Sequence, residues 1–152
     1  MEEPIERPVE KIRLEILKNI EDCGCSVIHT GSSDAPYTYS VGVEFTTGQP
    51  DIVIAGADAR VAQTIINNYC SLAKKGETFE CDKPYDKFII SLGIFFKPVL
   101  KKHYKKFNAL NWFNSGTSHY NIWQLVLPDK VGKFPWEINF SKKLMAIQKL
   151  YY

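Results

Sequence analysis

The hydrophobic positions of this chain follow a helical period in four places. Apolar residues recur every three or four positions over residues 8–22 and 58–75, which predicts two amphipathic helices. Asp58 is a good N-cap for the second helix. The apolar stripe expected to be buried in that helix consists of Val61, Ile65, Tyr69 and Leu72. Weaker patterns predict a lysine-rich helix or irregular helical turn over 99–113 and a C-terminal helix over 141–151.

Other segments have the alternating or continuously apolar pattern of β-strands. They cover residues 25–30, 37–44, 51–55, 89–96 and 122–127. Turn-forming residues fill 31–36, between the first two, and predict a hairpin, whereas 83–87 is expected to be a polar turn. The runs 89–96 and 122–127 are almost continuously apolar, which is typical of central strands covered on both faces. This order predicts a single α+β domain over 1–152, with a mainly antiparallel sheet of about five to six strands and three to four helices.

Composition and charge exclude several classes of protein. The chain has 152 residues, 45% of them apolar and 24% charged, which is an ordinary globular profile. Lys and Arg number 19 against 17 Asp and Glu, so the net charge predicts no duplex nucleic acid and no anionic membrane as partner. No apolar run approaches the ~20 residues of a bilayer span, and the first residues lack the apolar core of a signal peptide. We therefore expect a cytoplasmic protein.

The cysteines and histidines do not predict a metal or cofactor site. Cys23 and Cys25 are one residue apart, which is neither a redox nor a zinc spacing, and Cys70 falls on the apolar side of a predicted helix. We expect all four thiols, including that of Cys81, to be reduced in the cell. A metal site would require His29 and His119 to converge with Cys25 or Asp129, and we predict none.

A basic segment stands out in an otherwise balanced chain. Residues 97–106 contain five lysines and a histidine without an acid, namely Lys97, Lys101, Lys102, His103, Lys105 and Lys106. One interpretation is a solvated helix face. The other is an anion site in which lysine and histidine donors, with His103 the best candidate among the histidines, contact a phosphate or carboxylate.

The segment Ala35–Glu44 has an unusual density of specific residues. Strand alternation places Tyr37, Tyr39, Val41 and Val43 on one face, and Ser40 on the other. Gly42 within the strand indicates a bulge or close approach of a ligand, or else room for a neighbouring aromatic ring.

A second such segment, Gln124–Glu137, begins with a buried strand. Asp129 after its proline is either a base or ligand, or a turn residue that hydrogen-bonds to nearby amides. The following Phe134-Pro135-Trp136 is expected to return to the core as an aromatic clamp beside Leu125.

These two segments resemble the signature of the bacterial family catalogued as domain of unknown function 4262. The matching residues are Tyr39-Ser40-Val41-Gly42-Val43, Pro50 through Gly56, Gly76, and Gln124 through Trp136. The departures from the family pattern are Ser40 for threonine, Val43 for leucine and Asp51 for glutamate. The resemblance covers about residues 20–140 and implies a fold and a bacterial or phage setting. It implies no reaction, because the family has none assigned.

The functional prediction is a binding module, since the sequence contains no nucleotide-loop, zinc-protease or nucleophile-elbow fingerprint. The module would bind a small anionic, nucleotide-like ligand or a partner protein, in a setting of bacterial or phage conflict. Its predicted site combines aromatic and polar residues with the basic segment: Tyr39, Ser40, Lys101, Lys102, His103, Trp112, Trp123, Asp129 and Trp136. One alternative is a hydrolase or transferase with His103 or His119 and Asp129 as an acid–base pair. Another is a homo-oligomer formed through an exposed C-terminal Leu150-Tyr151-Tyr152.

Overall fold

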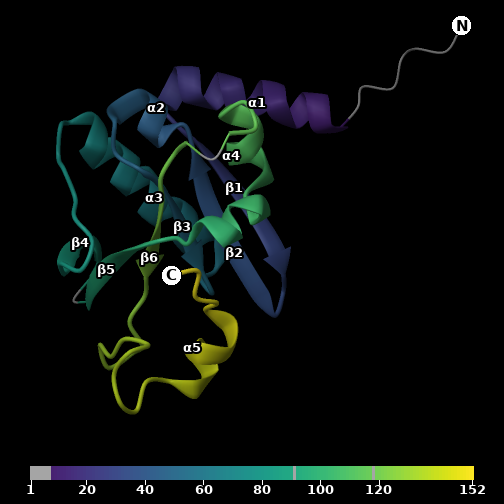
Figure 1. Ribbon diagram of the computed structural model, residues 1–152. Coiled ribbons are helices and arrows are strands. Elements are labelled where there is room, and N and C mark those ends of the chain that lie inside the picture. Colours follow the sequence, from purple (N-terminus) through teal and green to yellow (C-terminus); the bar gives the residue numbers. More distant parts are fainter. Residues whose placement is uncertain (1–7, 91, 118) are drawn as a thin grey trace, which may run out of the picture.

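The fold is built on one six-stranded sheet in the order β1-β2-β3-β6-β5-β4 (Figure 1). The computed structural model describes residues 8–90, 92–117 and 119–152. The strands are β1 (Ser26–Ser32), β2 (Ala35–Val41), β3 (Asp51–Ala55), β4 (Tyr85–Ile89), β5 (Leu92–Pro98) and β6 (Ile122–Val126). The central β3 and β6 run parallel, and the other neighbours pair antiparallel. The prediction of an α+β domain with a mainly antiparallel sheet is therefore confirmed.

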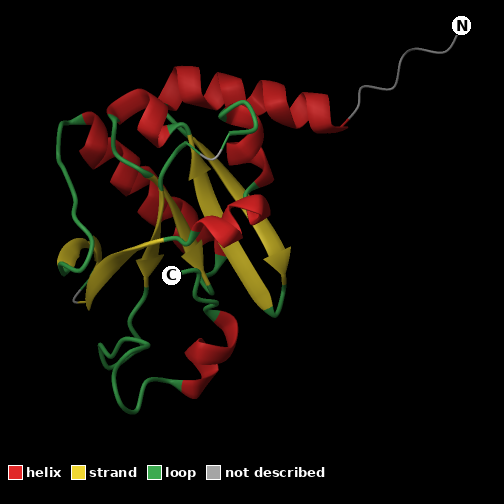
Figure 2. Cartoon of the chain, viewed as in Figure 1, coloured by secondary structure: helices red, strands yellow, loops and turns green. Residues whose placement is uncertain are grey.

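Helices cover both faces and both ends of this sheet (Figures 1 and 2). They are α1 (Pro8–Cys23), α2 (Val43–Thr47), α3 (Ala59–Lys74), the 3₁₀ helix η1 (Lys101–Lys106), α4 (Asn108–Phe113) and α5 (Lys142–Ile147). In Figure 1, α5 and the loop before it lie at the end of the sheet opposite α1. Within the described ranges, no helix is long and apolar enough to cross a bilayer.

The core consists of two apolar layers, one on each face of the sheet. Alternation along β3 sends Ile52 and Ile54 into the layer under α3, and Val53 into the layer under α1 and α4. Tyr69 of α3 and Leu110 of α4 are fully buried in their respective layers. The two faces therefore carry separate apolar layers.

The long helices largely follow the sequence pattern. Asp58 caps α3, accepting a hydrogen bond from the Arg60 N–H at 2.9 Å. Val61 was expected to be buried, and this prediction is wrong, because 51% of its surface is exposed. Ala62 and Ile66 belong to the buried face of the helix instead.

The predicted helix over 99–113 and the C-terminal helix are both shorter than expected. Phe107, fully buried, separates η1 from α4 with a non-helical backbone. The last helix ends at Ile147, since Gln148 leaves the helix and its side chain bonds to Leu127, the residue after β6. Tyr151, expected to be exposed with its neighbours, is buried and belongs to the core.

The strand expected over 37–44 ends at Val41. Gly42 has a φ of +98°, which turns the chain into the unpredicted helix α2, and Val43 packs on the opposite face to Tyr39. Gly42 makes room neither for a ligand nor for an aromatic ring. It makes room for Ile20, whose Cγ1 would lie 2.7 Å from an added Cβ.

The apolar run 89–96 and the polar segment before it form a hairpin rather than one central strand. Residues 83–87, expected to be a turn, contain the start of β4, which is an edge strand. Phe88 of β4 packs against Phe79 and Phe96, so a few aromatic contacts hold this polar strand. Ser91, within the predicted strand, lies outside the described residues.

Candidate functional site

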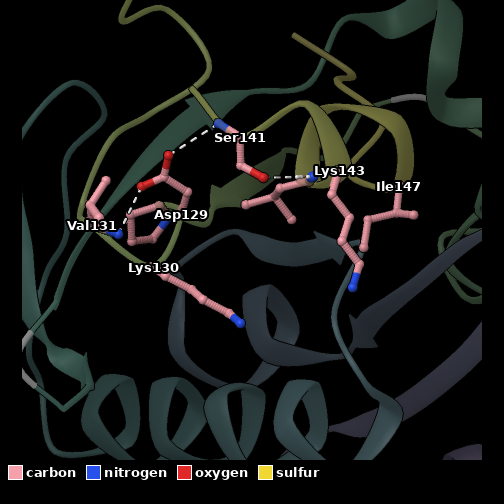
Figure 3. Close-up of a pocket in the computed structure, with 8 residues that line it drawn as sticks. Asp129, Lys130, Val131, Ser141, Lys143 and Ile147 are labelled. Carbon is pink, nitrogen blue, oxygen red and sulfur yellow. Dashed lines mark hydrogen bonds between the residues drawn. The ribbon is translucent and has the colours of Figure 1, made fainter. Parts of the chain in front are cut away.

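A pocket of about 520 Å³ opens between the end of β6 and α5 (Figure 3). One wall comes from residues 128–131, which follow β6 within the segment Gln124–Glu137, and the other comes from Ser141 and α5. The lining residues are Pro128, Asp129, Lys130, Val131, Ser141, Lys143, Leu144 and Ile147. Four of these contribute apolar side chains, two contribute lysines, and the other two are Asp129 and Ser141. Pockets that bind small molecules have this composition, mostly apolar with a few polar groups.

Asp129 builds the loop that forms the first wall. Its Oδ1 accepts hydrogen bonds from the N–H groups of Val131 at 3.0 Å and Lys133 at 2.9 Å. Its Oδ2 accepts one from the Ser141 N–H at 3.1 Å, which joins the two walls (Figure 3). The turn-residue interpretation of Asp129 therefore fits these contacts, and the carboxylate has little capacity left to act as a base.

Electrostatics agree with that structural role. Desolvation acts to raise the pKa of Asp129, but the N–H groups of Lys133, Ser141 and Val131 outweigh it and hold the pKa below its usual value. The carboxylate is thus ionised at neutral pH, with its charge directed at backbone amides.

The second wall is fixed at both ends of α5. Ser141 caps the helix, its Oγ accepting a hydrogen bond from the Leu144 N–H at 3.2 Å. At the other end, the buried Gln148 side chain bonds both to the N–H of Leu127 at 2.8 Å and to its C=O at 3.2 Å. A short helix that would be marginal alone is therefore held against β6.

A second buried glutamine holds the residues after α5. The Oε1 of Gln124 accepts a hydrogen bond from the Tyr151 N–H at 2.8 Å, and its Nε2 donates to the C=O of Lys149 at 2.8 Å. Gln124 is the first residue of the segment Gln124–Glu137. These two hydrogen bonds explain why a polar residue lies within a buried strand.

Lys130 and Lys143 give the pocket its charge. Both are exposed, and Figure 3 shows both side chains extending to the same side of the pocket. Within the described ranges, neither forms an ion pair or a side-chain hydrogen bond. Two cations beside an apolar floor suit an organic anion, because the body of the ligand leaves water while its charged group stays at the rim.

The predicted site residues do not form one cleft. Tyr39 and Trp112 do come together, in a groove of about 380 Å³ that Lys106 of the basic segment also lines. Arg13 already occupies the face of the Trp112 ring, at 5.0 Å from its centroid. Trp123 lies on the opposite face of the sheet, where its ring packs 5.7 Å from that of Phe96.

Trp136 was expected to share a core with Leu125, and this is wrong. Trp136 is 47% exposed, whereas Leu125 is fully buried under α3. The indole stacks on Phe134 with centroids 5.0 Å apart, and the Nζ of Lys97 lies over the indole ring, 4.8 Å from its centroid. Only the Phe134 side of the clamp points inward.

The basic segment is dispersed around η1 rather than focused on a cavity. Lys101 donates to the C=O of Tyr120 at 3.0 Å, while Lys102 is exposed. Desolvation, with help from Lys102 and other neighbouring lysines, lowers the pKa of His103, whose ring packs 5.5 Å from Tyr151. A neutral imidazole is a weaker anion ligand than the sequence interpretation assumed.

Ser40 belongs to a buried polar cluster instead. Its hydroxyl donates to Oδ1 of Asp51 at 2.7 Å and accepts a hydrogen bond from the Ile52 N–H at 3.0 Å. The Val43 N–H also donates to Oδ1 of Asp51, at 2.9 Å, which fixes the start of α2. Ser40 is fully buried, so its role in this arrangement is to position α2 relative to β3.

The histidines do not assemble with Asp129. The ring of His29 bonds to Thr38 and Gln63, and neither His103 nor His119 lines the pocket that contains Asp129. Over the described ranges, no cluster of three or more His, Cys, Asp or Glu is arranged to hold a metal.

Sequence reasoning missed the residues that give the pocket its chemistry. Lys130 lies within the segment Gln124–Glu137, but the sequence interpretation assigned a possible role in this segment to Asp129 and not to Lys130. Ser141 entered the prediction only as the first residue of the C-terminal helix. Lys143 had no signal, because the approach of α5 to the end of β6 depends on the hydrogen bonds of Gln148, a tertiary contact.

These features define an α+β domain with a small apolar pocket at one end of its sheet. The family described as Domain of unknown function (DUF4262) matches residues 19–141, and the chain belongs to that family. The match includes the Asp129 wall and ends at Ser141, just before α5. No curated protein and no solved structure matches the chain.

Proposed function

We propose that this protein is a binding module for a small organic anion with an apolar body, and that the pocket between residues 128–131 and α5 is its site. One observation carries the proposal: an apolar pocket is flanked by Lys130 and Lys143, which have no ion-pair partner in the described part of the chain. Leu144 and Ile147 would bury the body of the ligand, and the two ammonium groups would neutralise its carboxylate, phosphate or sulfonate.

The hydrolase or transferase alternative receives no geometric support. Asp129 directs its carboxylate at three backbone amides, and no histidine lines the pocket. A partner protein and a homo-oligomer stay predictions from the sequence.

Binding of an anionic dye tests the proposal. The dye 8-anilinonaphthalene-1-sulfonate combines an aromatic body with a sulfonate, and its fluorescence rises when it enters an apolar site. Lys130→Ala with Lys143→Ala should weaken binding by about tenfold or more, since a hydrogen bond to a charged group contributes about 1.5–3 kcal/mol. The effect should shrink as salt is added, because both lysines are exposed.

The matched control is Lys102→Ala with Lys105→Ala, which removes the same charge from η1, outside the pocket. Its dye affinity should equal that of the native protein. If the control loses binding and the pocket variant keeps it, the anion site lies on the basic segment instead. Native mass spectrometry of the freshly purified protein, with the pocket variant beside it, would identify a natural ligand.

A further inference from the structure

Three of the four cysteines gather at a second pocket, where the end of α1 and the start of β1 meet α3. This pocket has a volume of about 450 Å³ and is separate from the proposed anion site. Its lining residues are Cys23, Cys25, Asn67, Cys70, Ser71, Lys74 and Lys75. All three sulfur atoms belong to free thiols; Cys25 and Cys70 are buried and Cys23 is exposed.

Cys25 and Cys70 line the same wall region of this pocket, although 44 residues lie between them in the sequence. The turn at Gly24, with a φ of +93°, makes this approach possible: an added Cβ there would lie 3.5 Å from the sulfur of Cys70. The ammonium of Lys74 donates to the C=O of Cys23 at 3.1 Å, and the Cys70 thiol donates to the same oxygen at 3.9 Å. A cation therefore lies beside Cys70.

The two thiols are chemically unequal. The neighbouring Cys25 thiol lowers the pKa of Cys70 against the opposing effect of burial, and Lys74 lowers it further. The neighbouring Cys70, together with burial, raises the pKa of Cys25. Cys70 is thus the thiol that ionises, and Cys25 the one that keeps its proton. Nucleophilic attack requires the thiolate.

We propose that Cys25 and Cys70 form a redox-active dithiol, which a small hydroperoxide admitted by this pocket converts to a disulfide. The Cys70 thiolate attacks the peroxide, so an S–O bond forms, the O–O bond breaks and the alkoxide or hydroxide leaves. Cys70 is then a sulfenic acid, and the peroxide has gained the two electrons that the sulfur lost. Cys25 next attacks that sulfur, forming the S–S bond while water leaves with the Cys25 proton.

Mass spectrometry of the peroxide-treated protein tests this chemistry. The reduced protein is treated with hydrogen peroxide, its remaining thiols are alkylated, and its peptides are mapped. The expected product lacks two hydrogen atoms per chain and contains a peptide linked through Cys25 and Cys70. Cys81 is the internal control: burial raises its pKa to about 11, so it should remain a thiol and be alkylated.

Two variants separate the steps. Cys25→Ser should stop the reaction at the sulfenic acid, which dimedone would trap on Cys70, whereas Cys81→Ser should form the disulfide as the native chain does. A disulfide through the exposed Cys23, or peroxide treatment that leaves Cys25 and Cys70 as thiols, would overturn the proposal. The peptide map of the native chain decides this even if Cys25→Ser fails to fold.

Discussion

Asp51 should make this protein less stable as the pH rises from about 4 to about 7. Its carboxyl group is fully buried at the start of β3, and this desolvation raises its pKa from 3.8 to about 7. Hydrogen bonds from the Ser40 hydroxyl and from the N–H groups of Val43 and Glu44 act in the other direction and offset part of the effect. Asp51 is therefore a group that folding holds in its protonated form.

The sign follows from proton binding in the two states. Between 3.8 and about 7, the folded state keeps the Asp51 proton that the unfolded state has lost, so the free energy of unfolding falls with each pH step. Below this window both states are protonated, and above it both are ionised, so the slope vanishes on either side. The whole change corresponds to roughly 4 kcal/mol.

Urea unfolding of the native protein and of Asp51→Asn, at a series of pH values from about 4 to about 8, measures this effect. The asparagine cannot titrate, but its oxygen can still accept the hydrogen bonds of Ser40 and Val43. The stability of the native protein relative to the variant should therefore fall across the window. Ser40→Ala should keep the titration and move it to higher pH, because it removes a hydrogen bond that lowers the pKa. Parallel curves for the native protein and Asp51→Asn would refute the argument from burial.

Two further pairs of variants test the packing by urea unfolding. Trp136→Ala should cost less than about 2 kcal/mol, since the indole is 47% exposed, whereas Phe96→Ala in the core should cost about 3–5 kcal/mol; equal losses would restore Trp136 to the core. Gly42→Ala should cost about 3 kcal/mol or more, because its Cβ would meet Ile20 at 2.7 Å in addition to the strain at positive φ. Gly48→Ala has a similar φ but open space around it and should cost only about 1 kcal/mol, so similar losses at both glycines would contradict the close contact.

The sequence predicts the fold well where one periodic pattern decides an element. The long helices and the first hairpin depend on local apolar spacing, on a cap such as Asp58 and on turn residues, and all of these act within a few positions. It predicts poorly where tertiary contacts decide. A strand as polar as β4 forms because Phe88 meets Phe79 and Phe96, and no local pattern contains that contact.

The candidate site was harder to predict than the fold for a related reason. Aromatic residues and clustered lysines are visible in sequence, but the sheet separates Tyr39 from Trp123 by placing them on opposite faces. The pocket at α5 instead depends on Asp129 and Gln148, whose hydrogen bonds reach across the fold. Likewise, nothing in the spacing of Cys25 and Cys70 indicates that their thiols meet.

The two buried glutamines have an evolutionary consequence. Their side chains bond the segment after Ser141 to β6 and to Leu127 just after it, and within the described residues this segment pairs with no strand of the sheet. A chain that kept Gln124 and Gln148 could therefore exchange the outward residues of α5, Lys143 among them, without disturbing the ladder of strands. The side chains of α5 that line the pocket and the side chains that fix this segment to the sheet are different residues, so the first set can change while the second stays the same.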